Sequence, residues 1–174
     1  MQDTLPIHFA PLQGYTEAIY RNAHDAFFGG VDTYYTPFVR LEKGNFRRRD
    51  VRGIEPENNG VPHLIPQLIA SSAEKAEVIL SLFIEKGYQE VDINLGCPFP
   101  LLAKRHNGSG ILPYPEEVKA LLSIVTRYPQ ISFSVKMRLG WEQPDECLAL
   151  APILNDLPLR QITMHPRLGK QGYK

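Results

Sequence analysis

The sequence predicts an α/β fold of the TIM (β/α)8 barrel class, and three observations support this prediction. Short apolar runs rich in β-branched residues alternate along the chain with segments of helical periodicity, an order that is typical of repeated βα units. Several of these runs are apolar almost throughout, as expected for parallel strands that are buried on both faces. Polar and reactive side chains gather where the runs end, and in a barrel those ends converge on one face.

Six strands and four helices are predicted, each to within a few residues. The strands cover residues 7–11, 33–37, 63–69, 90–95, 132–137 and 161–164, and the helices cover residues 17–28, 72–86, 115–128 and 145–154. Ser72 and Gly87 are suitable limits for the second helix, and Pro115 followed by two glutamates is typical of a first helical turn. Residues 41–62 show no clear period and are predicted to form a loop with room for a short hairpin.

An open, doubly wound sheet is the alternative arrangement, but it would spread the polar strand ends along one edge. The barrel explains their common position better. Six strands are two short of closure, and a barrel cut there exposes two unpaired strand edges. We therefore expect residues 1–174 to form a partial catalytic TIM barrel, truncated after about six strands, as the front part of a longer protein or a shortened form of one.

The composition is that of a soluble protein and argues against several classes. Nineteen basic and nineteen acidic residues give a net charge of zero, so the surface is not built as a whole for polyanions. No apolar run approaches the roughly 18 residues of a membrane span, and the N-terminus lacks the features of a secretory signal. We expect a cytoplasmic protein with no membrane partner and no metal site, in which both cysteines are free thiols.

An apolar strand that ends in residues 94–98 (NLGCP) carries the strongest functional signal. Pro98 disfavours the helical region for Cys97, and Gly96 leaves room for a flat ligand close to the backbone. The residues alone leave Cys97 as a nucleophile, a general acid or an inert thiol. No histidine within a few positions would activate it as a thiolate, whereas a neutral thiol with a pKa of about 8.5 is able to protonate carbon.

Two cations share one side of a later strand. Lys136 lies in the strongly β-forming run 133–138, and Arg138, two positions further on, projects from the same face. A lysine at this place either extends outward to solvent or points into the barrel mouth, where it would meet an anion or a polarised carbonyl. The second cation on the same face favours the functional interpretation.

Other polar residues at strand ends allow a structural and a functional role. The amides of Gln67 and Asn94 are suited to the edge of a planar heterocycle, or are buried and bonded to backbone groups. His165 is the one histidine at a late strand end, and a core role is its alternative. Residues 107–110 (NGSG) resemble a phosphate-binding loop only weakly, so a tight turn is favoured there.

Taken in order, these motifs resemble those of the tRNA-dihydrouridine synthase family. The similarity includes residues 10–16 (APLQGYT), 67–68 (QL), 92–98 (DINLGCP), 135–141 (VKMRLGW) and 165–167 (HPR). Residues 94–98 (NLGCP) and 135–141 (VKMRLGW) are together highly specific, and the resemblance covers nearly the whole chain from about Ile7. The chain departs from the family pattern at Gln13, where many members have alanine, and at residues 100–102, where many have a lysine.

The resemblance implies a TIM-barrel flavoenzyme that reduces uridine to 5,6-dihydrouridine in tRNA. FMN would be the cofactor, NADPH or NADH the reductant and tRNA the partner, with hydride passing from reduced FMN to C6 of the uracil. Cys97 would be the general acid that protonates C5. The implied cofactor-binding residues are Pro11, Leu12, Gln13, Gln67, Lys136 and His165, and the implied substrate-binding residues are Asn94 and Arg138. The family's C-terminal helical tRNA-binding domain is absent from this chain, and the sequence shows no obligate protein partner.

Three other interpretations remain open from the sequence. One is another pyrimidine-acting FMN barrel, such as a dihydroorotate dehydrogenase-like oxidoreductase. A second is a Schiff-base aldolase, in which Lys136 would be the nucleophile. The third is a noncatalytic fragment in which the barrel face does not close.

Overall fold

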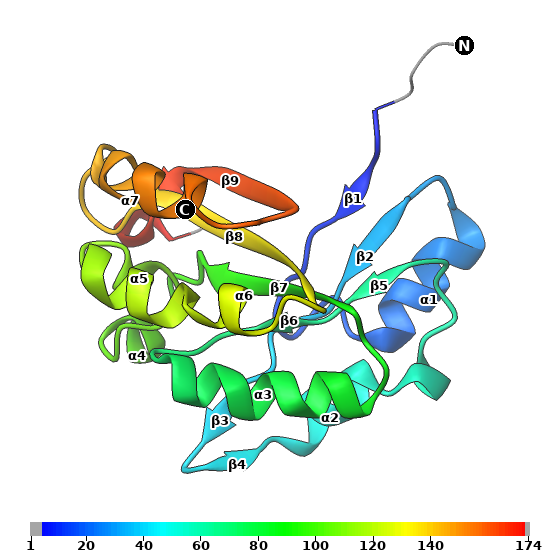
Figure 1. Cartoon of the computed structure of the whole chain (residues 1–174). Coiled ribbons are helices and arrows are strands. Elements are labelled where there is room, and N and C mark those ends of the chain that lie inside the picture. The colour runs from blue at the N-terminus through cyan, green and yellow to red at the C-terminus, as the bar shows by residue number, and fades with distance from the viewer. Residues whose placement is uncertain (1–4, 173–174) are drawn as a thin grey trace.

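Two parallel sheets that meet at Pro66 run through the computed structural model, which describes residues 5–172 (Figure 1). One has the order β1-β2-β5, and the other has the order β6-β7-β8-β9. Every neighbouring pair in both sheets is parallel. The strands are β1 (His8–Phe9), β2 (Thr33–Tyr35), β5 (Leu64–Ile65), β6 (Gln67–Leu68), β7 (Glu90–Leu95), β8 (Ser132–Gly140) and β9 (Gln161–Leu168).

The strand order confirms the predicted fold class. Strands β5 and β6 form the predicted strand 63–69, divided at Pro66, which has no N–H to donate to a ladder. Counted as one, they complete a series of six strands, each beside the strand that precedes it along the chain. This sequential order is that of a (β/α)8 barrel, whereas a doubly wound sheet reverses direction at a switch point.

The predicted helices are present, and a further helix occupies part of the expected loop. The helices are α1 (Ala18–Phe27), α2 (Arg48–Ile54), α3 (Ala73–Glu85), α4 (Pro100–Ala103), α5 (Pro115–Leu122), α6 (Ile124–Arg127) and α7 (Glu146–Asn155). Short 3₁₀ turns lie at η1 (Pro56–Asn58), η2 (Gly108–Ile111) and η3 (Gly169–Gln171). The predicted helix 115–128 is thus two helices, α5 and α6, that meet at Ser123.

The hairpin predicted within residues 41–62 is present, but the remainder of that segment, predicted to be an irregular loop, contains helix α2 and the turn η1. Strands β3 (Leu41–Glu42) and β4 (Asn45–Phe46) pair in antiparallel orientation. Helix α2 follows, and its first turn is stabilised by an ion pair of 2.8 Å between Arg47 and Asp50. Its last residue, Ile54, is fully buried. With seven residues, α2 is too short for its apolar period to be visible in the sequence.

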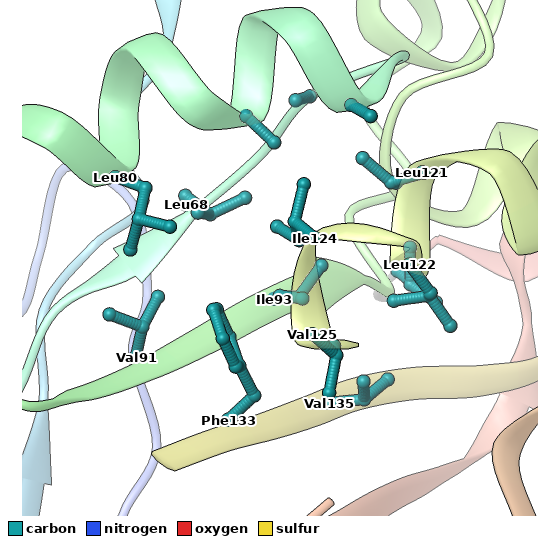
Figure 2. Close-up of a cluster of buried hydrophobic side chains, with 14 of the residues drawn as sticks. Leu68, Leu80, Val91, Ile93, Leu121, Leu122, Ile124, Val125, Phe133 and Val135 are labelled. Carbon is teal, nitrogen blue, oxygen red and sulfur yellow. The ribbon is translucent and has the colours of Figure 1, made fainter. Parts of the chain in front are cut away.

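The core lies between one face of the sheet and the helices that follow its strands. In Figure 1, α3, α5 and α6 lie along β6, β7 and β8. Figure 2 shows Val91 and Ile93 of β7 and Phe133 and Val135 of β8 in this core, together with Leu80 and other helix residues. Since side chains alternate along a strand, the residues between them project from the opposite face. That inner face carries Asp92 and Asn94 of β7 and Ser134, Lys136 and Arg138 of β8.

Several large apolar side chains are exposed on the first helix and the last strand. Ile19 and Phe27 of α1 and Ile162 and Met164 of β9 are each 39% exposed or more. Within residues 5–172, both β1 and β9 pair with a strand on one side only. In a closed barrel, positions of this kind are covered by neighbouring βα units. None of the helices in the described part is long and apolar enough to cross a membrane.

Replacing Phe83 by alanine tests the packing of α3 on the sheet. Phe83 is fully buried in the core, so the substitution removes apolar contacts and leaves a cavity. We expect the free energy of unfolding to fall by about 3–5 kcal/mol, measured by urea denaturation. Phe27→Ala on α1, where the ring is 83% exposed, should change it by about 0.5 kcal/mol or less. Equal losses in the two variants would contradict this description of the core.

Candidate active site

Cys97 lies in a turn just beyond the carboxyl end of β7, and its backbone is bound from two sides. On one side, the Oδ1 atom of Asn94 accepts hydrogen bonds from the N–H groups of Gly96, at 3.0 Å, and Cys97, at 2.8 Å. On the other, the N–H and the hydroxyl of Ser109 both donate to the Cys97 carbonyl, at 3.0 and 2.9 Å. These four hydrogen bonds fix the place from which the thiol projects.

Gly108 lies directly against this turn. Its φ angle is +60°, and a Cβ atom built on it would lie 2.6 Å from the carbonyl oxygen of Cys97 and 2.8 Å from its Cβ. Residues 107–110 are therefore not a loop open to a phosphate. Asn107 precedes the turn η2 (Gly108–Ile111), which contains the other three residues and supports the cysteine, as the turn interpretation of the NGSG motif predicted.

Gly108→Ala should displace the Cys97 turn. The substitution adds a left-handed backbone strain of about 1–2 kcal/mol and a clash with the cysteine backbone. Gly44→Ala is the matched control, because Gly44 has φ +80° but no atom within 4 Å of the place that a Cβ would take. We expect a larger loss of unfolding free energy in Gly108→Ala than in Gly44→Ala, and a changed rate of Cys97 alkylation only in Gly108→Ala. Similar behaviour of the two variants would contradict the contact.

Behind the cysteine turn, a buried hydrogen-bond chain crosses three strands. The Asn94 amide donates to the Oε1 atom of Gln67 at 2.7 Å, and the Gln67 amide donates to the carboxylate of Asp92 at 2.6 Å. The other Asp92 oxygen accepts from the Ser134 hydroxyl at 2.6 Å. Asn94, Gln67 and Cys97 are thereby joined in one structure, and each of the two amides keeps one further N–H for a ligand.

The three basic residues predicted on β8 and β9 lie on the same inner face. In the parallel ladders, Lys136 is paired with Asn94, and Arg138 is paired with His165. Burial lowers the pKa of Lys136. The charge of Asp92 opposes this effect, and the charge of Arg138 adds to it. Burial also lowers the pKa of His165, and the positive charges of Arg138, Lys136 and Arg167 act in the same direction. This side of the site is therefore electropositive and suited to an anionic group.

Arg138 is almost fully buried and binds backbone groups of its own chain, so it has a structural role besides any contact with a substrate. It is 1% exposed, and its guanidinium donates to the backbone carbonyls of Leu168, at 2.7 Å, and Gly172, at 3.2 Å. It thus holds the segment after β9 against β8. The substrate-binding role of Arg138 stays a prediction.

The environment of Cys97 keeps its thiol protonated. The cysteine is free, and burial raises the pKa of the thiol, an effect that a backbone hydrogen bond from Phe99 and the charges of Arg138 and Arg40 partly oppose. A raised pKa leaves a neutral thiol at neutral pH. Such a group is a proton donor, whereas an attacking thiolate requires a lowered pKa.

The segment after β1 supplies one further polar group. The chain turns there through hydrogen bonds from the N–H groups of Tyr15 and Thr16 to the carbonyl of Leu12. Both polar atoms of the Gln13 amide are buried and have no hydrogen-bond partner. A buried amide of this kind costs free energy unless a ligand satisfies it. Pro11 and Leu12 precede it in the same segment, but no hydrogen bond joins the three to the cysteine turn in the described residues.

Most residues of this candidate site were singled out from the sequence, whereas the residues behind it were not. The structure brings together Gln67, Asn94 and Cys97 by direct hydrogen bonds and places Lys136, Arg138 and His165 on adjacent strands. Asp92, Ser134 and Ser109 were not singled out. The signal for Asp92 was present, because a carboxylate two positions before Asn94 in an apolar strand must share its face. No group of three or more potential metal ligands is found in residues 5–172.

Comparison with known proteins agrees with this arrangement. The family model described as dihydrouridine synthase matches residues 8–174. A protein named probable tRNA-dihydrouridine synthase 1, from Synechocystis sp., is 29% identical over 171 residues, which are 94% of this chain and 46% of that protein. The tRNA-dihydrouridine(16) synthases of Haemophilus ducreyi and Pseudomonas putida are 28% and 29% identical and are covered over 54% and 55% of their length.

The chain thus spans about half the length of the curated relatives that it matches. The family model covers nearly all of the chain and includes the cysteine turn, the buried amides and the basic strand ends. The chain belongs to the dihydrouridine synthase family.

Proposed function

We propose that the protein reduces uridine to 5,6-dihydrouridine in tRNA, using FMN and a nicotinamide reductant, with Cys97 as the general acid. The observation that carries this proposal is the half-buried, neutral thiol of Cys97, held by Asn94 next to an electropositive strand end. The family match supports the reaction class. The names of the relatives support tRNA as the substrate and partner, and a cytoplasmic location follows from that substrate.

The residues present fit a flat, polar cofactor with an anionic form. The unsatisfied amide of Gln13 and the remaining N–H of Gln67 would bind the heteroatoms of its ring edge. Lys136 and His165 would supply positive charge and hydrogen bonds, and Pro11 and Leu12 would pack against the ring. When bound and reduced by NADPH or NADH, FMN supplies the hydride that C6 of the uracil receives.

Cys97 completes the reduction of the C5=C6 bond. The carbon next to the hydride acceptor gains electron density and must take up a proton, and a neutral thiol is a suitable donor. The four hydrogen bonds to the backbone near Cys97 hold the donor in one place, which lowers the entropic cost of the transfer. Asn94, through its remaining N–H, and Arg138 would bind the carbonyl groups of the uracil.

The base must leave its stack to reach this site. A uridine in a folded tRNA would be extruded into the mouth of the barrel at a cost of a few kcal/mol, less where the loop is already strained. We propose that residues 1–174 supply the catalytic barrel part and that the helical tRNA-binding domain known in the family lies outside them.

The test uses the protein encoded by the complete gene that contains this sequence. Incubation with NADPH and an unmodified tRNA transcript should produce tRNA in which one or more uridines gain two hydrogen atoms, detected by mass spectrometry of the digested nucleosides. A protein that contains FMN but leaves the uridines unchanged with both nicotinamides would contradict the proposal.

The lowered pKa of Lys136 is the one observation that favours the aldolase alternative, because a nucleophilic amine must be uncharged. Borohydride trapping with a small aldehyde or keto acid separates the two reactions. A stable adduct on Lys136 would support the aldolase, and its absence in a protein that reduces tRNA supports the synthase.

A further inference from the structure

Asp92 is a buried carboxylate to which the proposed chemistry assigns no role. It lies on β7 with 1% of its surface exposed, two positions before Asn94 on the same face. Its two oxygens accept hydrogen bonds from both neighbouring strands, from Gln67 on β6 and from Ser134 on β8, each at 2.6 Å. A carboxylate in such a place is costly unless its charge is compensated, so its presence calls for an explanation.

The hydrogen bonds that lead from Cys97 to Asp92 have only one possible direction. The backbone N–H groups of Gly96 and Cys97 can only donate, so the Asn94 atom that they meet must be the oxygen. The nitrogen of Asn94 then donates to the oxygen of Gln67, and the nitrogen of Gln67 donates onward. The chain therefore has to end on an acceptor, which Asp92 provides.

We propose that Asp92 is a positioning residue for Cys97: as the terminal acceptor, it satisfies the last N–H of the amide chain and so holds the turn that carries the thiol. Without an acceptor at this position, a Gln67 amide that keeps its oxygen on Asn94 leaves its own N–H buried and unsatisfied. A Gln67 side chain that moves to relieve this cost takes the acceptor away from Asn94 and loosens the side chain that holds the cysteine turn. The inference rests on the proposed function, in which this turn delivers the proton.

A different role for Asp92 would be to supply negative charge. Two ionisable groups face it: Lys136 on β8, whose pKa it raises, and Tyr35 on β2, whose pKa it also raises. Asparagine at position 92 keeps an acceptor oxygen for Gln67 but removes the charge. Leucine has a similar volume and removes both. The acceptor role predicts that only leucine is harmful, and the charge role predicts that both are.

The pH dependence provides a second readout. Burial raises the pKa of Asp92 to about 6, although the hydrogen bonds from Ser134 and Gln67 and the charge of Lys136 oppose the rise. A protonated carboxyl group, like the asparagine amide, keeps one carbonyl oxygen that accepts from Gln67. The acceptor role therefore predicts the same rate profile below pH 6 in the wild type and in Asp92→Asn, and any decline that both share belongs to another group, such as His165. The charge role predicts a decline in the wild type alone as the pH drops through about 6.

The experiment compares Asp92→Asn, Asp92→Leu and Ser134→Ala with the wild type, in the protein encoded by the complete gene. The first measurement is kcat for tRNA reduction between pH 5 and 8. The second is the rate at which iodoacetamide alkylates Cys97, followed by mass spectrometry of the peptide that contains it. The alkylation needs neither tRNA nor turnover, so it reports on the cysteine turn even if the protein does not reduce tRNA.

We expect Asp92→Leu to lower kcat about 10- to 100-fold, the usual effect of misplacing a reacting group, and to change the alkylation rate. Asp92→Asn should stay within about threefold of the wild type in both measurements. Ser134→Ala removes a hydrogen bond that stabilises the carboxylate but leaves the acceptor for Gln67, so it should also stay within about threefold of the wild type. If Asp92→Leu does not fold, the pH profiles decide the question. Parallel profiles of the wild type and Asp92→Asn support the acceptor role, and a decline through about pH 6 that is present in the wild type, absent in Asp92→Asn and moved to higher pH in Ser134→Ala would contradict it.

Two other results would also overturn the inference. If Asp92→Asn is as defective as Asp92→Leu, the charge and not the acceptor matters. If Asp92→Leu has wild-type kcat and alkylation, Asp92 does not position the turn. The two readouts also separate this inference from the proposed function. If the wild type leaves tRNA unchanged, the proposed function fails. If the alkylation rates still follow the expected pattern in that case, the role of Asp92 in holding Cys97 is supported.

Discussion

Cys97→Ala is expected to lower the rate of dihydrouridine formation by about 10²- to 10⁴-fold, the usual contribution of a positioned general acid. The methyl group cannot donate a proton, and the four hydrogen bonds at this turn involve backbone atoms of residue 97 and its neighbour and therefore survive the substitution. The flavin content and the rate of flavin reduction by NADPH should stay unchanged. The measurement is the initial rate of dihydrouridine formation with unmodified tRNA, together with the visible spectrum.

The control for this substitution is the other cysteine of the chain. Cys147 lies on α7, and its thiol donates to the carbonyl of Pro144 at 3.2 Å, away from the inner face of the sheet. Cys147→Ala should keep wild-type activity. Because burial raises the pKa of the Cys97 thiol, loss of the thiol proton should lower the activity on the alkaline side. Activity in Cys97→Ala within about tenfold of the wild type would exclude the thiol as the general acid.

Lys136→Met is expected to weaken flavin binding by about 10- to 100-fold, corresponding to the loss of one charge-assisted hydrogen bond. Methionine keeps much of the length and apolar stem of lysine but has no cation, so the fold of β8 should persist. The measurement is the dissociation constant for FMN added to the flavin-free protein. Unchanged affinity would show that Lys136 does not contact the cofactor.

Lys136→Arg is the matched control, since arginine stays charged at all accessible pH values. Burial lowers the pKa of Lys136, so the wild-type amine loses its charge at a lower pH than an exposed lysine does. We therefore expect FMN affinity in the wild type to fall with rising pH earlier than in Lys136→Arg. Parallel pH profiles for the two proteins would mean that the charge of Lys136 does not bind the cofactor.

The regular parts of the fold were predictable because each had a period or a terminal signal. Strands β7 and β8 were predictable from their apolar runs. The start of α3 was predictable from Ser72, whose side chain accepts a hydrogen bond from the N–H of Lys75. Helix α2 was not predictable, since its first turn depends on the pairing of Arg47 with Asp50 and its packing on one buried isoleucine. Such tertiary contacts leave no periodic trace in a short segment.

The candidate site was predictable in its members but not in its connections. The sequence located Asn94 and Gln67 at strand ends, but it left open whether their amides bind a ligand or satisfy the protein. The structure shows that each amide satisfies neighbouring protein groups with part of its hydrogen-bonding capacity and keeps one N–H free for a ligand. Ser109 was hidden because its bonds to Cys97 join residues twelve positions apart, a distance that no local pattern encodes.

The most direct test of the account follows the visible spectrum of the protein encoded by the complete gene, in the absence of oxygen. We predict a flavin spectrum that bleaches on addition of NADPH or NADH and returns when unmodified tRNA is added, with a return that is slow or absent in Cys97→Ala. A complete protein that cannot be loaded with FMN, or whose reduced flavin is not reoxidised by unmodified tRNA, would contradict the account.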